Sequence, residues 1–289
     1  MESVSKKNLP GLPLLPAVPV VSIRANSPLV LLPARDLWNY RALFVFLIWR
    51  DLKLRYKQTA LGVMWAILQP LLATFTITVF FGSFVGLATH SGTPYALYVF
   101  SGMVPWTFFA NTVATSSNSL LRDTNLITKV YFPRMIIPAA SIGSGLLDFG
   151  IGFAVLLLLM PFYHWPWSWG ILLVPLLTLL LAGLTLATGL FTSALAVQYR
   201  DIRFIVPFGL QIWMFASPVI YPSSRLHGHL LQVMNANPVS GILGAYRHLL
   251  LGEPFHLGPL LYSAGFTLVF LLIGLRTFRG MERSFSDII

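Results

Sequence analysis

Residue types that usually carry catalysis are sparse in this sequence. It contains no cysteine, which excludes disulfides, thiolate metal sites and cysteine nucleophiles, and its six histidines are scattered without ligand spacing. It has no GxxxxGK[ST] phosphate-binding loop and no Ser/His/Asp or paired-carboxylate pattern. We therefore expect neither an enzyme nor a metal site, and any ATP-driven process would need its motor on another chain.

Asp148 is the one acidic residue that lies well inside an apolar run. A carboxylate within a membrane span is a functional candidate, often as part of a proton relay. No second acid lies nearby in the sequence, and the neighbouring apolar runs contain no basic residue. The sequence therefore favours a structural, hydrogen-bonding role for Asp148, with ion coupling as the alternative.

Polar and aromatic side chains form stripes along three of the apolar runs. At about 100° per residue each stripe falls on a narrow arc. Hydroxyls and aromatic rings without charges suit a conduit for a sugar-like substrate, but small polar residues also hold transmembrane helices together, so both interpretations stay open. The candidate channel residues are Trp65, Gln69, Thr76, Phe80 and Ser83 in the first stripe, Tyr98, Ser101, Phe109, Thr112 and Ser116 in the second, and Phe204, Phe208, Gln211 and Phe215 in the third.

The elements that position these residues are membrane spans. Only 10% of the residues are charged, 56% are hydrophobic, and the mean hydropathy is +0.76, which argues against a water-soluble fold. Residues 58–121 and 149–199 contain no Asp, Glu, Lys or Arg, and each run has room for two spans of about 20 residues. We expect an all-α integral membrane protein with six transmembrane helices, at residues 61–87, 95–121, 135–162, 170–197, 204–221 and 258–275.

The positive charges indicate an orientation in the membrane. The net charge of +10 would suit nucleic acid, but all lysines and arginines except Arg225 and Arg247 lie before the first span, in every second connection, or after the last span. Positive residues concentrate on the cytoplasmic side, so we expect both termini in the cytoplasm and no nucleic-acid partner. Residues 1–35 are proline-rich and indicate a cytoplasmic extension of a 36–289 transmembrane domain rather than a signal peptide.

Two further segments are expected outside the spans. Residues 36–57 place Arg50, Lys53 and Lys57 opposite a broad apolar face, which indicates a basic amphipathic helix on the cytoplasmic surface. This helix would either anchor the chain to lipid or dock a cytoplasmic partner. Residues 222–257 are too long for a plain turn and too polar to span, so we expect two short helices at the outer face.

Several short motifs follow one another in order between residues 36 and 287. They are RDLKLRYK at 50–57, KVYFPR at 129–134, YRDIR at 199–203, SPVIYP at 217–222, NP at 237–238 and YR at 246–247. Together they resemble the permease subunit of type-2 ABC exporters, in the branch that exports polysaccharides such as O-antigen, capsule or teichoic acid. The proline-rich residues 1–35 depart from the pattern of that family.

This resemblance implies a homodimer in the cytoplasmic (inner) membrane that works with two copies of a cytoplasmic ABC ATPase. ATP and Mg²⁺ would be bound by the ATPase, with no cofactor in this chain. It also implies an amphipathic interface helix, a coupling helix near residues 123–129, two outer gate helices, and an undecaprenyl-linked glycan that passes between the protomers. The implied ATPase contacts are Arg50, Lys53, Lys57, Asp123, Thr124, Asn125 and Lys129.

Three alternatives stay open. One is a type-2 ABC permease for another cargo, such as a drug, a lipid or haem. A second is an ion-coupled secondary transporter, for which Asp148 would be the coupling carboxylate. A third is a membrane scaffold that transports nothing, against which the long polar stripes argue weakly.

Overall fold

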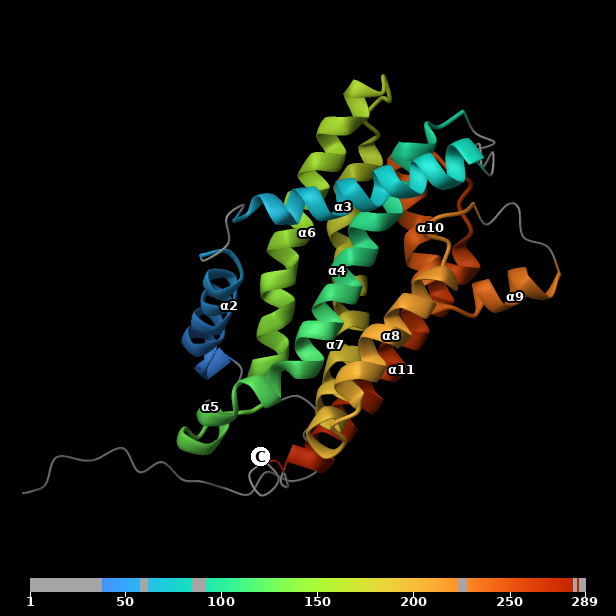
Figure 1. The fold of residues 1–289 in the computed structure, drawn as a ribbon. Helices are drawn as coiled ribbons and strands as arrows, with labels where there is room; N and C mark the ends of the chain where they lie inside the picture. Colours follow the sequence, from blue (N-terminus) through green and yellow to red (C-terminus); the bar gives the residue numbers. More distant parts are fainter. Residues whose placement is uncertain (1–37, 58–61, 85–91, 223–227, 283–284, 286–289) are drawn as a thin grey trace, which may run out of the picture. The chain divides into compact units, whose positions relative to one another are not determined.

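A computed structural model describes residues 38–57, 62–84, 92–222, 228–282 and 285 of the chain, and the secondary structure within these ranges is helical throughout (Figure 1). All of these residues belong to one unit, Leu32–Ile289. The expected proline-rich extension, residues 1–35, lies outside the described residues. The elements are α2 (Arg41–Tyr56), α3 (Met64–Ile77), the π-helix η1 (Thr78–Phe84), α4 (Tyr95–Arg122), α5 (Thr124–Lys129), α6 (Ile136–Phe162), the 3₁₀-helix η2 (Trp169–Leu173), α7 (Val174–Gln198), α8 (Ile202–Phe215), α9 (His229–Asn235), α10 (Pro238–Leu251) and α11 (Leu257–Glu282).

Four helices in the described part of the chain are long and apolar enough to cross a membrane. They are Met64–Gly82, Ile136–Phe162, Trp169–Gln198 and Leu257–Glu282. They coincide with the first, third, fourth and sixth expected spans and confirm an all-α integral membrane protein. The second expected span forms α4, which is long enough at 28 residues but carries more polar side chains, and the fifth forms α8, which has only 14 residues.

The fifth expected span is shorter as a helix than the sequence pattern indicated. Helix α8 ends at Phe215, whereas the apolar run continues to Tyr221. Pro218 explains the difference, because the residue before a proline is disfavoured in the helical conformation. The chain turns at Ser217, whose hydroxyl donates a hydrogen bond to the carbonyl oxygen of Trp213 at 2.8 Å.

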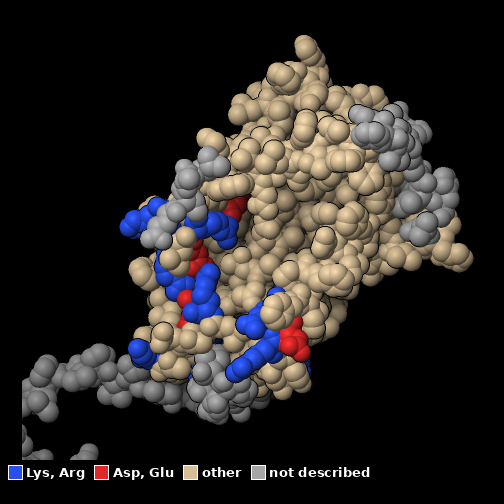
Figure 2. Space-filling model, viewed as in Figure 1, with Lys and Arg blue, Asp and Glu red and all other residues tan. Residues whose placement is uncertain are grey.

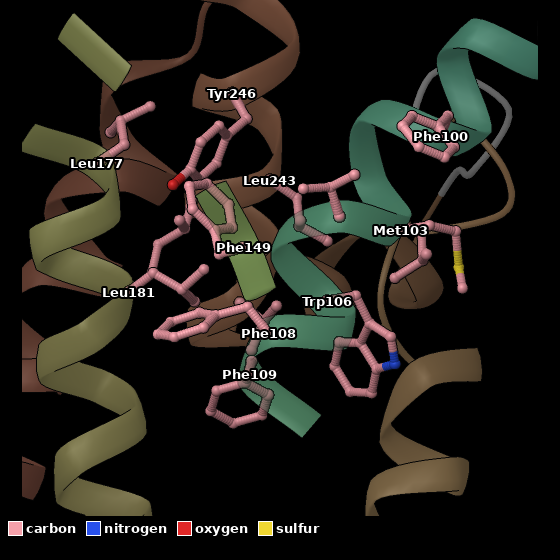
Figure 3. Close-up of a cluster of buried hydrophobic side chains, with 14 of the residues drawn as sticks. Phe100, Met103, Trp106, Phe108, Phe109, Phe149, Leu177, Leu181, Leu243 and Tyr246 are labelled. Carbon is pink, nitrogen blue, oxygen red and sulfur yellow. The ribbon is translucent and has the colours of Figure 1, made fainter. Parts of the chain in front are cut away.

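Helix α4 forms the centre of the bundle. It packs against α6, α7, α8 and α10, and α3 runs across α4 and α6 (Figure 1). Aromatic rings from several helices meet along α4, including Phe108 with Phe149 at 5.7 Å between ring centroids and Phe109 with Trp213 at 5.2 Å. Figure 3 shows Phe108 and Phe109 of α4 together with Phe149 and Tyr246 in this core. Edge-to-face packing of this kind stabilises the core beyond the apolar area that it buries.

Glycines let three of the helices approach closely. A Cβ added to Gly274 of α11 would lie 2.7 Å from the carbonyl oxygen of Ala187 on α7. A Cβ added to Gly241 of α10 would collide with the carbonyl group of Pro259 on α11. Backbones this close are typical of membrane helix packing, where small residues replace the hydrophobic effect as the source of tight contact.

Candidate functional site

A cluster of four charged residues fixes α2 to the junction of α4 and α5. The carboxylate of Asp51 is buried and accepts hydrogen bonds from Arg122 at 3.1 Å and from Arg50 at 3.0 Å. Arg50 also donates to Asp123 at 2.7 Å. Burial alone would lower the pKa of Arg50, but the hydrogen bonds to Asp123 and Asp51 outweigh it and raise that pKa above its usual value. Because a buried carboxylate needs such partners, the position of α2 depends on this cluster, which we call the α2 charge cluster.

The α2 charge cluster divides the ATPase contacts expected from the sequence into two groups. Arg50 and Asp123 point into the cluster and are largely occupied by it. Lys53 and Lys57 on α2 are exposed, as are Asn125 and Lys129 on or at the end of α5, and Thr124 is half-buried. The exposed group leaves a basic and polar surface beside the cluster (Figure 2).

Asp148 has a basic partner that the sequence analysis missed. The guanidinium of Arg55 forms an ion pair with the Asp148 carboxylate, and the hydroxyl of Tyr56 donates a hydrogen bond to the same group. The partners come from the last turn of α2 and not from a neighbouring apolar span. Gly143 allows the approach, because a Cβ there would collide with Ile48 of α2.

The second stripe lies inside the helix bundle. All five of its candidate channel residues are buried, with at most 3% of each residue exposed: Tyr98, Ser101, Phe109, Thr112 and Ser116. The Tyr98 hydroxyl donates to the carbonyl oxygen of Tyr221 at 3.3 Å, and Phe109 packs on Trp213. This geometry fits the helix-packing interpretation, and of the five residues Thr112 alone lines the groove described below.

The first and third stripes lie on the surface. The residue exposures are 47% for Trp65 and 58% for Phe80 on α3 and η1, and 66% for Phe208 on α8. Gln69, Thr76, Phe204, Gln211 and Phe215 are exposed as well. The side chain of Ser83 lies outside the described part of the chain. The structure therefore brings these two stripes to the surface of the chain, whereas the residues of the second stripe are buried.

A groove of about 420 Å³ opens between α2, α3, α4 and α6. Its wall includes the pair Arg55 and Asp148, the indole of Trp65, and the amides of Gln69 and Asn111. The surface in Figure 2 is hollowed beside the charged groups. No three His, Asp or Glu side chains of the described residues lie close enough to share a metal ion. The residues that line the groove offer an ion pair, amide and hydroxyl hydrogen bonds and aromatic contact.

Arg247 is a buried cation in the motif at 246–247. Only 3% of the residue is exposed, and its guanidinium donates to the carbonyl oxygen of Val219 at 2.8 Å and lies 3.7 Å from the ring centroid of Tyr98. It therefore ties the turn after α8 to α10 and α4. The motif was visible in the sequence, but this role was not.

Comparison with known proteins identifies the family. The ABC-2 type transporter family matches residues 42–251, which run from the start of α2 to the end of α10. The chain belongs to this family. As an ABC-2 type transporter subunit it is a transport permease rather than an enzyme, and both the α2 charge cluster and the groove lie within the matched region.

Three relatives refine the placement within the ABC-2 type transporters. The chain is 28% identical over 257 residues to the O-antigen export system permease protein RfbA of Myxococcus xanthus, covering 88% of this chain and 97% of that protein. It is 26% identical to the RfbA protein of Klebsiella pneumoniae, over 86% of this chain and 95% of that protein. It is 25% identical to the polysialic acid transport protein KpsM of Escherichia coli, over 81% and 92%. These similarities confirm the polysaccharide-export branch indicated by the motifs.

Proposed function

We propose that this chain is the transmembrane subunit of an ATP-driven exporter that moves a lipid-linked polysaccharide across the cytoplasmic membrane. The observation that carries the proposal is similarity over almost the whole chain to permeases named for O-antigen export and polysialic acid transport. The sequence has no phosphate-binding loop, so ATP and Mg²⁺ belong to a separate ATPase that binds at the cytoplasmic face.

The topology proposed for this exporter has six spans, with α4 and α8 added to the four apolar helices. The distribution of lysine and arginine supports cytoplasmic termini, with residues 1–35 as a cytoplasmic extension. Helices α9 and α10 form the segment before the last span and would act as outer gate helices. Most of α10 is buried against α11 and α4, which supports a fixed position for this second gate helix.

The proposed conduit lies between two copies of the chain and uses the exposed stripes of α3 and α8. Lipid offers no partner for the amides of Gln69 and Gln211, which share these surfaces with large aromatic rings. A second protomer that faces both stripes would enclose a channel lined by rings and amides. Aromatic faces tolerate different sugars, which allows a polymer to slide through without a deep binding well.

The proposed ATPase contact combines α5 with the exposed side of α2. The α2 charge cluster joins these two helices, so a displacement of α5 would be transmitted to α2 and then to α6. We expect single cysteines in Lys53→Cys and Asn125→Cys to crosslink to the ATPase, because the native chain offers no competing thiol. A cysteine in Leu158→Cys, near the other end of α6, serves as the control that should not crosslink. Failure of both cytoplasmic positions in an assembled complex would refute this docking surface.

The transport function is tested by deleting the gene in its own host and restoring it. Loss of the chain should leave completed glycan on the cytoplasmic side, and the restored gene should return it to the cell surface. Unchanged surface glycan in the deletion strain would refute the proposal, and a changed export of a drug, lipid or haem would favour the alternative cargo. Export that continues when a proton uncoupler is added and ATP is held constant separates ATP-driven from ion-coupled transport.

A further inference from the structure

The connection between α6 and α7 presents a dense group of exposed aromatic rings at the end of the bundle far from α5 (Figure 1). Residues 162–169, which we call the aromatic tip, contain three tryptophans, a phenylalanine and a tyrosine. The exposed fractions are 75% for Phe162, 65% for Trp167 and 89% for Trp169. Large rings exposed together mark a surface that meets a partner.

The aromatic tip is folded back on the end of α6. Pro161 has no N–H, so the carbonyl oxygen of Leu157 loses its helical partner four residues on. The indole N–H of Trp167 donates to that oxygen at 3.2 Å. The backbone N–H of Trp165 donates to the carbonyl oxygen of Met160 at 2.8 Å. Two carbonyl groups at the end of α6 are thus paired inside the protein, as backbone in contact with lipid requires.

The bundle holds the aromatic tip in place. A Cβ added to Gly170, directly after the tip, would lie 2.6 Å from the carbonyl oxygen of Leu249 on α10. The hydroxyls of Thr178 on α7 and Tyr246 on α10 share a hydrogen bond of 2.8 Å. The exposed rings therefore sit on a connection that is fixed to α10 and do not belong to a free loop.

The length of α6 places the aromatic tip at the outer boundary of the hydrocarbon core. In the proposed topology the cytoplasmic boundary on α6 lies between Ile136, where the helix begins, and Asp148, whose partner Arg55 shares a helix with the cytoplasmic Lys57. Phe162 comes 26 residues after the first limit and 14 after the second, which is about 39 and 21 Å of helix. The hydrocarbon core is about 30 Å thick, so its outer boundary falls between these two values.

The surface that leads to the aromatic tip is apolar and uncharged. Residues 149–199 contain no Asp, Glu, Lys or Arg. Leu158, one turn before Phe162 on α6, is 72% exposed, and Leu172 and Leu176 after the tip are 72% and 66% exposed. Leucines suit acyl chains, whereas tryptophan and tyrosine, with an apolar ring and a polar group, suit the headgroup level at the end of such a surface.

We propose that the aromatic tip binds phospholipids of the outer leaflet. The rings of Phe162 and Trp169 contact the upper part of the acyl chains, and the indole N–H of Trp169 donates to ester or phosphate oxygens of the headgroups. The contact anchors the outer end of the α6–α7 hairpin, and with it α10, in the membrane. The proposal rests on the proposed topology and involves neither the conduit stripes nor the ATPase contact.

The depth of a single nitroxide label tests this contact in the full chain, reconstituted in vesicles of phosphatidylethanolamine and phosphatidylglycerol. Pro166→Cys provides an exposed site within the tip and keeps every ring, and the native chain has no cysteine that competes. We expect the label within about 10 Å of the lipid phosphates, on the hydrocarbon side. It should collide often with dissolved oxygen and rarely with a water-soluble nickel chelate. Ser168→Cys is a second position if Pro166→Cys is poorly produced.

Two control positions calibrate the measurement. Leu158→Cys, about one helical turn before the tip, should place its label deeper by roughly 5 Å. Tyr131→Cys, at a residue that is 75% exposed in the connection after α5, should report water. Replacing both Phe162 and Trp169 by serine in the Pro166→Cys chain should move the tip label toward water and raise its collisions with nickel.

A tip label as accessible to nickel as the label of Tyr131→Cys would overturn the proposal. A label shielded from both oxygen and nickel would overturn it too, since protein would then cover the tip. Burial that appears only after the lipid-linked glycan is added would assign the tip to the cargo and also contradict the proposal. A membrane-impermeant reductant added outside intact cells separates the two levels. A tip that it cannot reach, while the label of Tyr131→Cys is reduced, would refute the topology itself, whereas a tip in water on the outer side counts against the lipid contact alone.

Discussion

Adding one methyl group at Gly102 should destabilise the bundle, because Gly102 of α4 lies against the buried guanidinium of Arg247. A Cβ at residue 102 would lie 2.6 Å from Nη2 of Arg247 and 3.1 Å from the carbonyl oxygen of Val219. The same nitrogen donates a 2.8 Å hydrogen bond to that oxygen. The guanidinium also lies on the ring of Tyr98, so it has no free space to move aside.

The cost of Gly102→Ala follows from these contacts. Overpacking a core with one methyl group costs about 1–3 kcal/mol, and a lost hydrogen bond to a charged group adds about 1.5–3 kcal/mol. Because the added methyl group strains the hydrogen bond without removing the guanidinium, we expect a total loss of about 2–4 kcal/mol in the free energy of unfolding. For a domain of this size that corresponds to a midpoint lower by about 5–15 °C.

Thermal unfolding of the detergent-purified full chain measures this loss. Gly150→Ala is the matched control: it lies within α6 with open space around its added Cβ, and we expect it to be neutral or to stabilise by about 0.5–1 kcal/mol. In an Arg247→Leu background Gly102→Ala should cost much less, since the colliding group is gone. An unchanged midpoint for Gly102→Ala, or an equal cost in both backgrounds, would refute the reasoning.

Three further predictions follow from the same structure. Asp148→Asn removes the charged partner of Arg55 and should lower the free energy of unfolding by about 1–3 kcal/mol. This loss is smaller than for a fully buried ion pair, because both side chains are partly exposed. Export per folded protein should persist. Addition of Arg55→Gln should restore part of the stability, and a total loss of export at normal yield would instead support ion coupling. Phe208→Ala should slow the export of long glycans while the protein yield stays unchanged. Phe109→Ala, at a buried position, should instead lower the free energy of unfolding by about 3–5 kcal/mol. Equal effects of the two variants on protein yield would contradict the assignment of Phe208 to the surface and Phe109 to the core. Gly241→Ala should separate α10 from α11 and reduce the folded yield seen by size-exclusion chromatography, because the added Cβ meets backbone that cannot turn away.

The helices could be predicted from the sequence because each apolar run without charges is bounded by polar or turn-forming residues. What periodicity could not provide is the direction in which each stripe faces. Tyr98 and Phe109 fall on one arc of α4, as Phe204 and Phe208 do on α8, and the two patterns are alike in sequence. Helix α4 is surrounded by other helices and α8 is not, so tertiary packing alone separates core from surface.

The partner of Asp148 could not be predicted for a related reason. The search for a basic residue covered the neighbouring spans, whereas Arg55 comes from a helix that precedes all of them. Its approach depends on Gly143, where a missing side chain makes room for Ile48. A single glycine in an apolar run has many explanations in sequence, and a contact between helices nearly a hundred residues apart becomes visible only in three dimensions.

The anchoring of α2 also sets a limit on how far the chain can be shortened. Large apolar side chains on this helix are exposed, including Phe46 and Trp49, so it resembles a peripheral attachment that could be trimmed. A truncated chain that began after residue 57 would nevertheless leave Asp148 without Arg55, and it would leave Asp123 with Arg122 as its remaining arginine partner. The smallest unit that folds autonomously must therefore start before α2, and a protease that cuts between α2 and α3 should leave the two pieces associated.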